Sequence, residues 1–265
     1  MPKFAANLSM LFVELPFLDR FEAASAAGFE GVEYLFPYDF EVEALTSRLR
    51  RFGLTQVLHN LPAGDWAKGE RGIACLPGRE EEFRDGVDRA VRYATALGCR
   101  QVNCLAGIAP EGTDRRVLNA TLLGNLRYAA ARLSEAGIGL LIEPVNTRDI
   151  PGFFLRDTRQ ARTIITEGDI DNLQIQYDVY HMQVMEGDLA RTIKANLDLI
   201  GHVQIADNPG RNEPGTGEIN YEFLFGYLDK VGYRGWVGCE YKPKGATLEG
   251  LKWMPPRRAA RKAVA

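Results

Sequence analysis

Several features that would assign this chain to a broad class are scarce or missing. Its 265 residues include only three histidines, at positions 59, 181 and 202, and four cysteines without a CxxC pair. Structural zinc sites use His and Cys, multi-zinc phosphodiesterases need several histidines, and small secreted scaffolds use paired cysteines. We therefore expect none of these classes, and we expect the cysteines to be buried thiols in a reducing compartment.

Long apolar segments are also missing. No run approaches the ~18 residues that span a bilayer, and the start, MPKF, lacks the apolar core of a signal peptide. The net charge of −3 is mild and gives no reason to expect a nucleic-acid or membrane partner. We expect a cytoplasmic protein, with residues 257–265 as a basic tail that is solvated or disordered.

Eight apolar or β-rich runs alternate with segments of helical periodicity. The runs cover residues 4–9, 31–36, 54–60, 100–107, 137–143, 172–178, 200–204 and 235–240. Helical periodicity covers residues 17–27, 42–52, 80–97, 115–136, 158–167, 189–199 and 221–231. Glycines at 28, 53, 98, 137, 201 and 232 are expected to end helices. The pattern predicts the α/β class with a single (β/α)8 TIM barrel over residues 1–256.

The last four predicted strands each end at a polar residue that could bind a metal. These residues are Glu143, Asp178, Gln204 and Glu240. Strand ends of a parallel barrel meet at one mouth, where catalytic groups lie. Each of the four residues has a simpler explanation: Glu143 could be a solvated rim residue, Asp178 could cap a turn, Gln204 could satisfy a neighbour, and Glu240 could pair with Lys242 at the surface. Their occurrence on four consecutive strands favours a common site.

The chemistry of these four side chains selects among cofactors. Three carboxylates and an amide offer hard oxygen donors, which suit Mg²⁺ or Mn²⁺ better than zinc. The sequence therefore predicts a divalent metal. The glycine-containing segment 215–220 lacks the third glycine of a dinucleotide fingerprint, so we expect no nicotinamide cofactor.

Seven motifs spread over nearly the whole chain carry a family resemblance. They are AANLSMLF (5–12), FEGVEYLFPYDF (29–40), residues 59–86 beginning HNLPAGDW, LIEPVN (141–146), IQYDVYHMQVMEG (175–187), HVQIADNPGRNEPGTGEINY (202–221) and GWVGCEYKP (235–243). They resemble the hydroxypyruvate isomerases of the xylose-isomerase-like barrel superfamily. The resemblance implies that Glu143 and Glu240 are the catalytic acid/base pair, and that these two bind the metal with Asp178 and Gln204. Related sugar epimerases carry His where Gln204 stands.

The activity that this resemblance implies is an aldose–ketose type isomerisation. Hydroxypyruvate and tartronate semialdehyde would interconvert through an enediol(ate), with two glutamates moving protons and a metal stabilising charge. A 2-oxo-tetronate isomerase, a ketose 3-epimerase and a non-catalytic barrel that binds a small acid are the alternatives. Two proton-transfer groups argue against the last.

The expected partner is a small keto or hydroxy acid, whose carboxylate calls for a cation in the pocket. Arg71, Arg211 and Lys242 are the candidates, and a guanidinium suits a carboxylate best. His181 could hydrogen-bond a substrate oxygen or be a structural histidine. Asn60, at the end of the third predicted strand, is a further candidate for substrate binding.

A long loop follows that third strand. Residues 61–78 show no period and contain prolines, glycines and Trp66. The loop could be a lid that excludes water from the site. It could equally be a contact within a homo-oligomer, which we expect without a defined subunit number.

Overall fold

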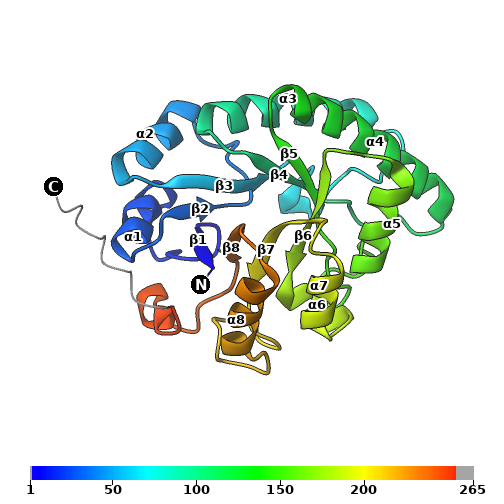
Figure 1. Ribbon diagram of the computed structural model, residues 1–265. Coiled ribbons are helices and arrows are strands. Elements are labelled where there is room, and N and C mark those ends of the chain that lie inside the picture. Colours follow the sequence, from blue (N-terminus) through cyan, green and yellow to red (C-terminus); the bar gives the residue numbers. More distant parts are fainter. Residues whose placement is uncertain (1, 255–265) are drawn as a thin grey trace.

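The barrel of this protein is closed by eight parallel strands. The computed structural model describes residues 2–254, and its strands pair in chain order, with β8 returning to β1 (Figure 1). The strands are β1 (Lys3–Asn7), β2 (Gly31–Glu33), β3 (Thr55–Asn60), β4 (Gln101–Cys104), β5 (Gly139–Ile142), β6 (Leu173–Asp178), β7 (Ile200–Ile205) and β8 (Trp236–Cys239). The predicted (β/α)8 barrel is confirmed. The tail predicted at residues 257–265 lies outside the described residues.

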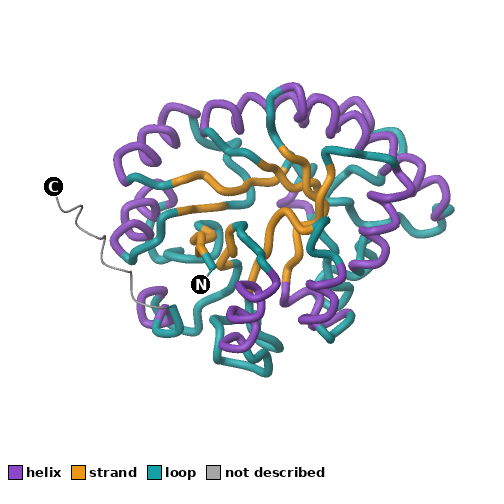
Figure 2. Tube along the Cα trace, in the orientation of Figure 1, coloured by secondary structure: helices purple, strands orange, loops and turns teal. Residues whose placement is uncertain are grey.

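Helices surround this ring of strands (Figure 2). They are α1 (Arg20–Ala26), α2 (Val42–Phe52), α3 (Glu80–Leu97), α4 (Arg115–Glu135), α5 (Thr158–Gly168), α6 (Val179–Met185), α7 (Leu189–Ala195) and α8 (Tyr221–Val231). Residues 2–254 also contain three short 3₁₀ helices, η1 (Phe17–Asp19), η2 (Trp66–Lys68) and η3 (Thr247–Leu251). Sequence periodicity missed α6, because a helix of seven residues that directly follows a strand is too short to show a period.

Some of the predicted element boundaries were wrong for physical reasons. Strands β2 and β4 end earlier than predicted, because the apolar runs there continue into buried loops at the barrel mouth. Gly201 does not end a helix: it lies inside β7, where a Cβ atom would be 2.7 Å from the Leu141 side chain. Gly98, by contrast, does end α3 in the left-handed conformation, with φ 65°.

The inside of the barrel divides into an apolar floor and a polar upper layer. Below the mouth, Ala5, Val57, Leu58 and Leu141, which lie within their strands, form a small buried cluster against Trp236, the first residue of β8. Toward the C-terminal ends the interior becomes polar. The buried side chains there include Asn7, Glu33, Asn103, Gln176, Asp178, His202 and Gln204. Such a layer is stable only if its groups are hydrogen-bonded to one another.

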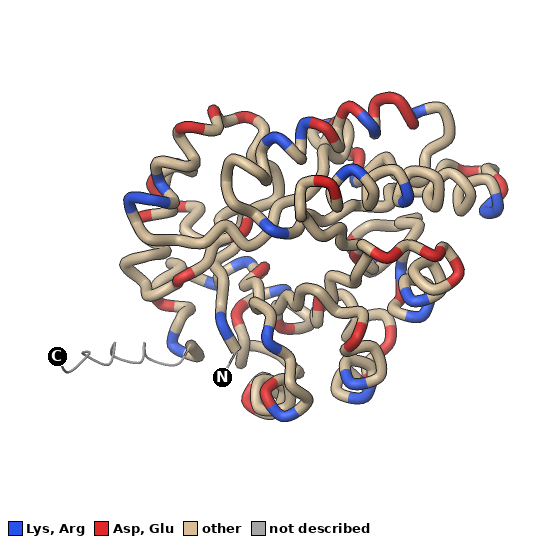
Figure 3. Tube along the Cα trace, turned by 45° about the horizontal axis from the view of Figure 1, so that its top comes forward, with Lys and Arg blue, Asp and Glu red and all other residues tan. Residues whose placement is uncertain are grey.

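The outer surface carries both signs of charge, interspersed along the helices (Figure 3). No helix within residues 2–254 is long and apolar enough to cross a bilayer. All four cysteines are buried free thiols, as predicted.

Candidate active site

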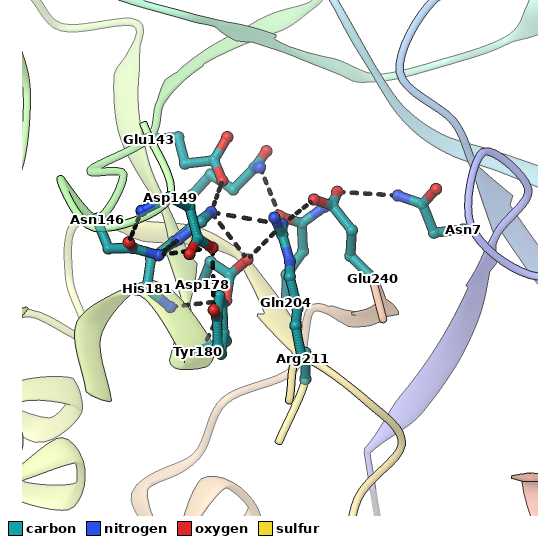
Figure 4. Close-up of polar contacts among 12 residues, drawn as sticks. Asn7, Glu143, Asn146, Asp149, Asp178, Tyr180, His181, Gln204, Arg211 and Glu240 are labelled. Atoms are coloured by element: carbon teal, nitrogen blue, oxygen red, sulfur yellow. Dashed lines mark hydrogen bonds and ion pairs between the residues drawn. The ribbon is translucent and has the colours of Figure 1, made fainter. Parts of the chain in front are cut away.

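The structure brings the four strand-end residues together at the mouth of the barrel (Figure 4). Glu143 directly follows β5, Asp178 ends β6, Gln204 lies near the end of β7, and Glu240 directly follows β8. All four side chains are buried. Glu143 and Glu240 both line a cavity of about 740 Å³. The prediction that distant strand ends would meet in one place therefore agrees with the geometry.

Glu240 receives three hydrogen-bond donors. Its Oε2 accepts from Nδ2 of Asn7 at 2.9 Å and from Nε2 of Gln204 at 2.8 Å, and its Oε1 accepts from Nη2 of Arg211 at 2.8 Å. Burial raises the pKa of Glu240 to about 8, and the charge of Arg211 opposes this rise. The surroundings thus support a carboxylate that gains a proton near neutral pH.

Glu143 has weaker support for a negative charge. Its Oε2 accepts from Nδ2 of Asn103 at 2.8 Å. Burial, together with the nearby carboxylates of Glu240 and Asp178, raises the pKa of Glu143 well above its usual range. The protonated form of Glu143 is therefore favoured, which suits a general acid.

Asp178 caps the turn that follows β6, which is one of the two explanations offered by the sequence. Its Oδ1 caps α6 by accepting from the backbone N–H groups of Tyr180 at 2.8 Å and His181 at 3.3 Å. Its Oδ2 is buried and has no hydrogen-bond partner, with Nη2 of Arg211 at 3.9 Å. A buried carboxylate oxygen left without a partner is one of the costlier features of a fold, and it fits a ligand for a cation.

The shorter of two contacts indicates which ring nitrogen of His181 carries the proton, because Asn146 lies 2.7 Å from Nδ1 whereas Nη2 of Arg211 lies 3.5 Å from Nε2. Asn146 accepts from the backbone N–H of Asp149 through Oδ1, at 2.8 Å, so its Nδ2 donates to Nδ1 of His181 at 2.7 Å. In the neutral ring the hydrogen is then on Nε2, which lies 3.8 Å from Oε1 of Glu143. Burial, and then the charge of Arg211, lowers the pKa of His181 well below its usual range. His181 can thus act as a neutral donor.

Arg211 reaches the centre of the site from the loop after β7. Its backbone has φ 53°, and its carbonyl accepts from the backbone N–H of Lys242 at 2.8 Å. Asp207 organises the same loop by accepting from three consecutive backbone N–H groups, those of residues 215–217. The guanidinium of Arg211 lies between Glu240 and Asp178 (Figure 4). Arg211 is therefore already paired with the acidic groups of the protein itself.

The loop 61–78 borders the same cavity. The guanidinium of Arg71 stacks over the Trp66 ring at 4.0 Å, and that ring packs edge-on against Phe36 at 5.1 Å. Trp66, Arg71, Lys242 and Asn60 all line the cavity. Asn60 also accepts from Nδ2 of Asn103 through Oδ1 at 3.2 Å. All five predicted substrate-binding residues, Asn60, Arg71, His181, Arg211 and Lys242, therefore face one space.

Several polar residues of the site were not predicted. They are Asn7, Glu33, Asn103, Asn146, Asp149, Gln176, Tyr180 and His202. The signal that could have found Glu33 and Asn103 is the one that found Glu143, a polar residue inside an apolar strand. Asn146 and Asp149 lie in a loop, where such a signal does not exist.

The acidic side chains fit a hard divalent cation. Within residues 2–254, ligand atoms of Glu143, Asp178 and His181 lie within 4.8 Å of one another. Oδ2 of Asp178, which has no hydrogen-bond partner, and the Glu143 carboxylate are suitable donors. Gln204 differs: its Nε2 faces the carboxylates, and its Oε1 accepts from Nε2 of Gln176 at 2.6 Å. As oriented, Gln204 does not present an oxygen to a cation beside Glu240.

The barrel fold and the carboxylates at its mouth define a class of TIM-barrel protein, and sequence comparison places the chain in such a class. Residues 21–257 match the family described as xylose isomerase-like TIM barrel, and the chain belongs to this family. It is 59% identical to hydroxypyruvate isomerase of Escherichia coli (strain K12), over 97% of this chain and 100% of that protein. It is 49% identical to a 2-oxo-tetronate isomerase of Cupriavidus necator, over 97% and 98% of the two chains. The predicted resemblance and the isomerase class are confirmed.

Solved structures give the same fold. A crystal structure named AP endonuclease, family 2, from Brucella melitensis has a TM-score of 0.95 at 51% identity, covering 98% of this chain and 100% of that one. A 3-keto-D-glucoside 4-epimerase from E. coli has a TM-score of 0.79 at 22% identity, covering 95% and 98%. At that identity the epimerase supports the fold alone.

Proposed function

We propose that this chain is a keto-acid isomerase that interconverts hydroxypyruvate and tartronate semialdehyde. The observation that carries the proposal is a pair of buried carboxyl groups, Glu143 and Glu240, which line one cavity with unequal hydrogen-bond support. Two such groups meet the needs of a reaction that removes a proton from one carbon and returns one to its neighbour. The relatives named as isomerases of small keto acids support the same reaction.

The two carboxyl groups divide the proton transfers. In the direction from hydroxypyruvate, the Glu240 carboxylate takes a proton from C3, the electron pair of that C–H bond forms the C2–C3 double bond, and the π electron pair of the C2 carbonyl moves to O2, which gives an enediolate. The hydroxyl proton on O3 moves to O2, the O3–C3 bond becomes the aldehyde carbonyl, and C2 takes a proton from the Glu143 carboxyl. Each positioned transfer contributes about 10²–10⁴-fold.

The surrounding side chains would orient the substrate and hold the charge that develops. Nε2–H of His181 would donate to a substrate oxygen, while Arg211 keeps Glu240 in place. Glu143, Asp178 and Glu240 would hold a divalent cation, with Mg²⁺ or Mn²⁺ suiting these donors. Such a cation would stabilise negative charge on the substrate oxygens during proton transfer.

The substrate carboxylate would be held by Arg71 and Lys242. Both line the cavity, whereas Arg211 is already paired with Glu240 at 2.8 Å. A planar guanidinium can pair with a carboxylate through two hydrogen bonds, which favours Arg71 for this contact. Trp66, which stacks on Arg71, would then cover the bound acid.

A four-carbon substrate is the second candidate. Relatives at 49% and 47% identity are named 2-oxo-tetronate isomerases, and the cavity of about 740 Å³ is larger than a three-carbon acid requires. Both substrates present a 2-oxo acid with a neighbouring hydroxyl-bearing carbon, so the same residues would act on either. We therefore expect the preference between the two acids to appear as a difference in kcat/KM.

The test is an assay in D₂O. Purified protein supplied with Mg²⁺ or Mn²⁺ is incubated with hydroxypyruvate, and NMR follows both the semialdehyde and the entry of deuterium at carbon. A parallel reaction with 2-oxo-tetronate compares kcat/KM for the two acids. Semialdehyde formation with deuterium at C2 supports the proposal. Folded protein that neither forms the product nor exchanges the C3 protons with solvent contradicts it.

A further inference from the structure

A further acidic residue, Glu33, lies in the barrel interior beneath Glu240 and has no part in the proton transfers. Its side chain is buried, and its Oε2 lies 2.7 Å from Nε2 of the buried His202. Space for this carboxylate comes from Gly238, because a Cβ atom there would be 2.3 Å from both Glu33 oxygens. A carboxylate enclosed in this way costs free energy unless it is paired and hydrogen-bonded.

Two amide groups connect Glu33 to Glu240. Nδ2 of Asn7 donates to Oε1 of Glu33 at 3.0 Å and to Oε2 of Glu240 at 2.9 Å. Nε2 of Gln204 likewise donates to Oε1 of Glu33 at 2.7 Å and to Oε2 of Glu240 at 2.8 Å. A primary amide has two N–H hydrogens, so each amide gives one to each carboxylate.

These contacts fix which end of the Gln204 amide faces the site. If the amide were rotated, its oxygen would lie 2.7 Å from Oε1 of Glu33 and 2.8 Å from Oε2 of Glu240. A cation beside Glu240 could offset the second oxygen–oxygen contact, but the contact with Glu33 would remain. Rotation would also place two amide nitrogens together, because Nε2 of Gln176 donates to Oε1 of Gln204 at 2.6 Å.

We propose that Glu33, backed by His202, is a positioning residue that holds the Asn7 and Gln204 amides as hydrogen-bond donors to Glu240, and that Gln204 is therefore not a metal ligand. The kinetic part of this inference rests on the proposed function; the orientation of Gln204 does not. A catalytic carboxylate works only within a narrow range of positions, and a buried network fixes Glu240 more firmly than a single contact would.

The kinetic test compares Glu33→Met with Glu33→Gln. Methionine removes the oxygen that accepts from both amides, so we expect kcat to fall about 10- to 100-fold while KM stays within about threefold. Glutamine keeps an oxygen for the two amides, and Nδ1 of His202, which has no partner, allows that ring to change tautomer. Glu33→Gln should therefore retain kcat within about threefold of wild type.

A matched control uses the same kind of exchange elsewhere in the barrel. Gln56 is a buried strand glutamine whose Nε2 donates to the carbonyl of Leu58 at 2.7 Å, outside this network. Gln56→Met should leave kcat unchanged even if the melting temperature falls. Equal kcat losses in Glu33→Gln and Glu33→Met, or a normal kcat in Glu33→Met, would overturn the positioning role. If Glu33→Met does not fold, a kcat loss in Glu33→Gln comparable with Glu240→Gln overturns it equally.

The second test needs no substrate. Crystals of the wild-type protein are soaked in Mn²⁺, and anomalous scattering locates the ion. We expect either no ion beside Gln204, or an ion on the carboxylates with the Gln204 amide still in hydrogen-bond contact with Glu33. An ion at bonding distance from Oε1 of Gln204 would overturn the inference. If wild-type protein does not turn over hydroxypyruvate, the proposed function fails while this measurement still decides the orientation of Gln204.

Discussion

The two glutamates at the barrel mouth are the same residue type in opposite settings. Glu143 follows β5 and accepts one amide hydrogen, from Asn103. Glu240 follows β8 and accepts two amide hydrogens and one from the guanidinium of Arg211. Both are buried, so burial alone does not distinguish them. The difference shows that the neighbours of a carboxyl group, more than its position on a strand, decide whether it suits the acid or the base.

The two glutamates also differ in protonation near neutral pH. The pKa of Glu143 is raised well above its usual range by burial and by two nearby carboxylates. The pKa of Glu240 is raised to about 8 by burial, and Arg211 holds it from rising further. In the proposed mechanism, Glu240 loses its proton as pH rises toward 8 and serves as the base, while Glu143, with its raised pKa, serves as the acid. Activity should therefore increase with pH through this range.

The largest effect is expected from removing either carboxyl group. Glu143→Gln and Glu240→Gln should each lower kcat by about 10²–10⁴-fold, because an amide cannot shuttle a proton. Melting temperatures should show that both variants fold. Glu186→Gln is the control, since Glu186 accepts from Thr158 and does not line the cavity. Near-normal kcat in either site variant would remove that residue from the pair.

The sequence predicted the fold well because the barrel depends on local patterns. Apolar strands, helical periodicity and the glycine after α3 are properties of short segments. The strand-end carboxylates Glu143 and Glu240 were also visible, since each interrupts or ends an apolar run. Because the C-terminal ends of the strands of a parallel barrel meet at one mouth, the positions of these residues at strand ends were enough to place them together.

The polar network behind Glu240 could not be predicted in the same way. Asn7 and Glu240 are 233 positions apart, and Glu33 and His202 are 169 apart. Their pairing depends on barrel closure and on the missing side chain at Gly238. The position of Arg211 depends on a loop with φ 53° that Asp207 holds in place. Such contacts follow from tertiary packing, which no local pattern encodes.

Removal of a divalent cation should have the next largest effect. If Glu143, Asp178 and Glu240 hold Mg²⁺ or Mn²⁺, chelation with EDTA should lower activity about a hundredfold, and either ion should restore it. Elemental analysis confirms that the chelated protein is metal-free. Asp178→Asn should weaken Mn²⁺ binding in a direct titration. Full activity of the metal-free protein would leave the two carboxyl groups as the whole of the proton-transfer machinery.

A smaller effect should follow from changing Arg211, the neighbour that makes the surroundings of Glu240 differ from those of Glu143. Arg211→Met removes the cation that opposes the rise in the pKa of Glu240, so that pKa should move above about 8. Fewer molecules then carry the base form at pH 7, and raising the pKa by about one lowers that fraction about tenfold. The pH profile of kcat/KM should move to higher pH. Arg211→Lys should move the profile less. An unchanged midpoint in Arg211→Met would show that the charge of Arg211 does not lower the pKa of Glu240.

The smallest effect on kcat is expected at Arg71, and this variant tests whether Arg211 is committed to Glu240. Because that pairing leaves another cation to bind the substrate carboxylate, Arg71→Met should raise KM with little change in kcat, by about 1–3 kcal/mol in binding. Lys68→Met is the control, since Lys68 is an exposed cation on the same loop and pairs with Asp65.

Hydrogen exchange across residues 61–78 then separates a lid from a fixed wall. If Trp66 and Arg71 close over the bound acid, backbone amides of this loop should become protected when hydroxypyruvate is added, because closure replaces solvent contacts with buried ones. The Arg71→Met variant should lose that protection and Lys68→Met should keep it. Equal protection with and without substrate would rule out closure. An unchanged KM in Arg71→Met would assign the binding of the substrate carboxylate to Lys242 or Arg211 instead. If Arg211 binds it, Arg211 supports Glu240 only without substrate, and the difference in support between the two glutamates applies only then.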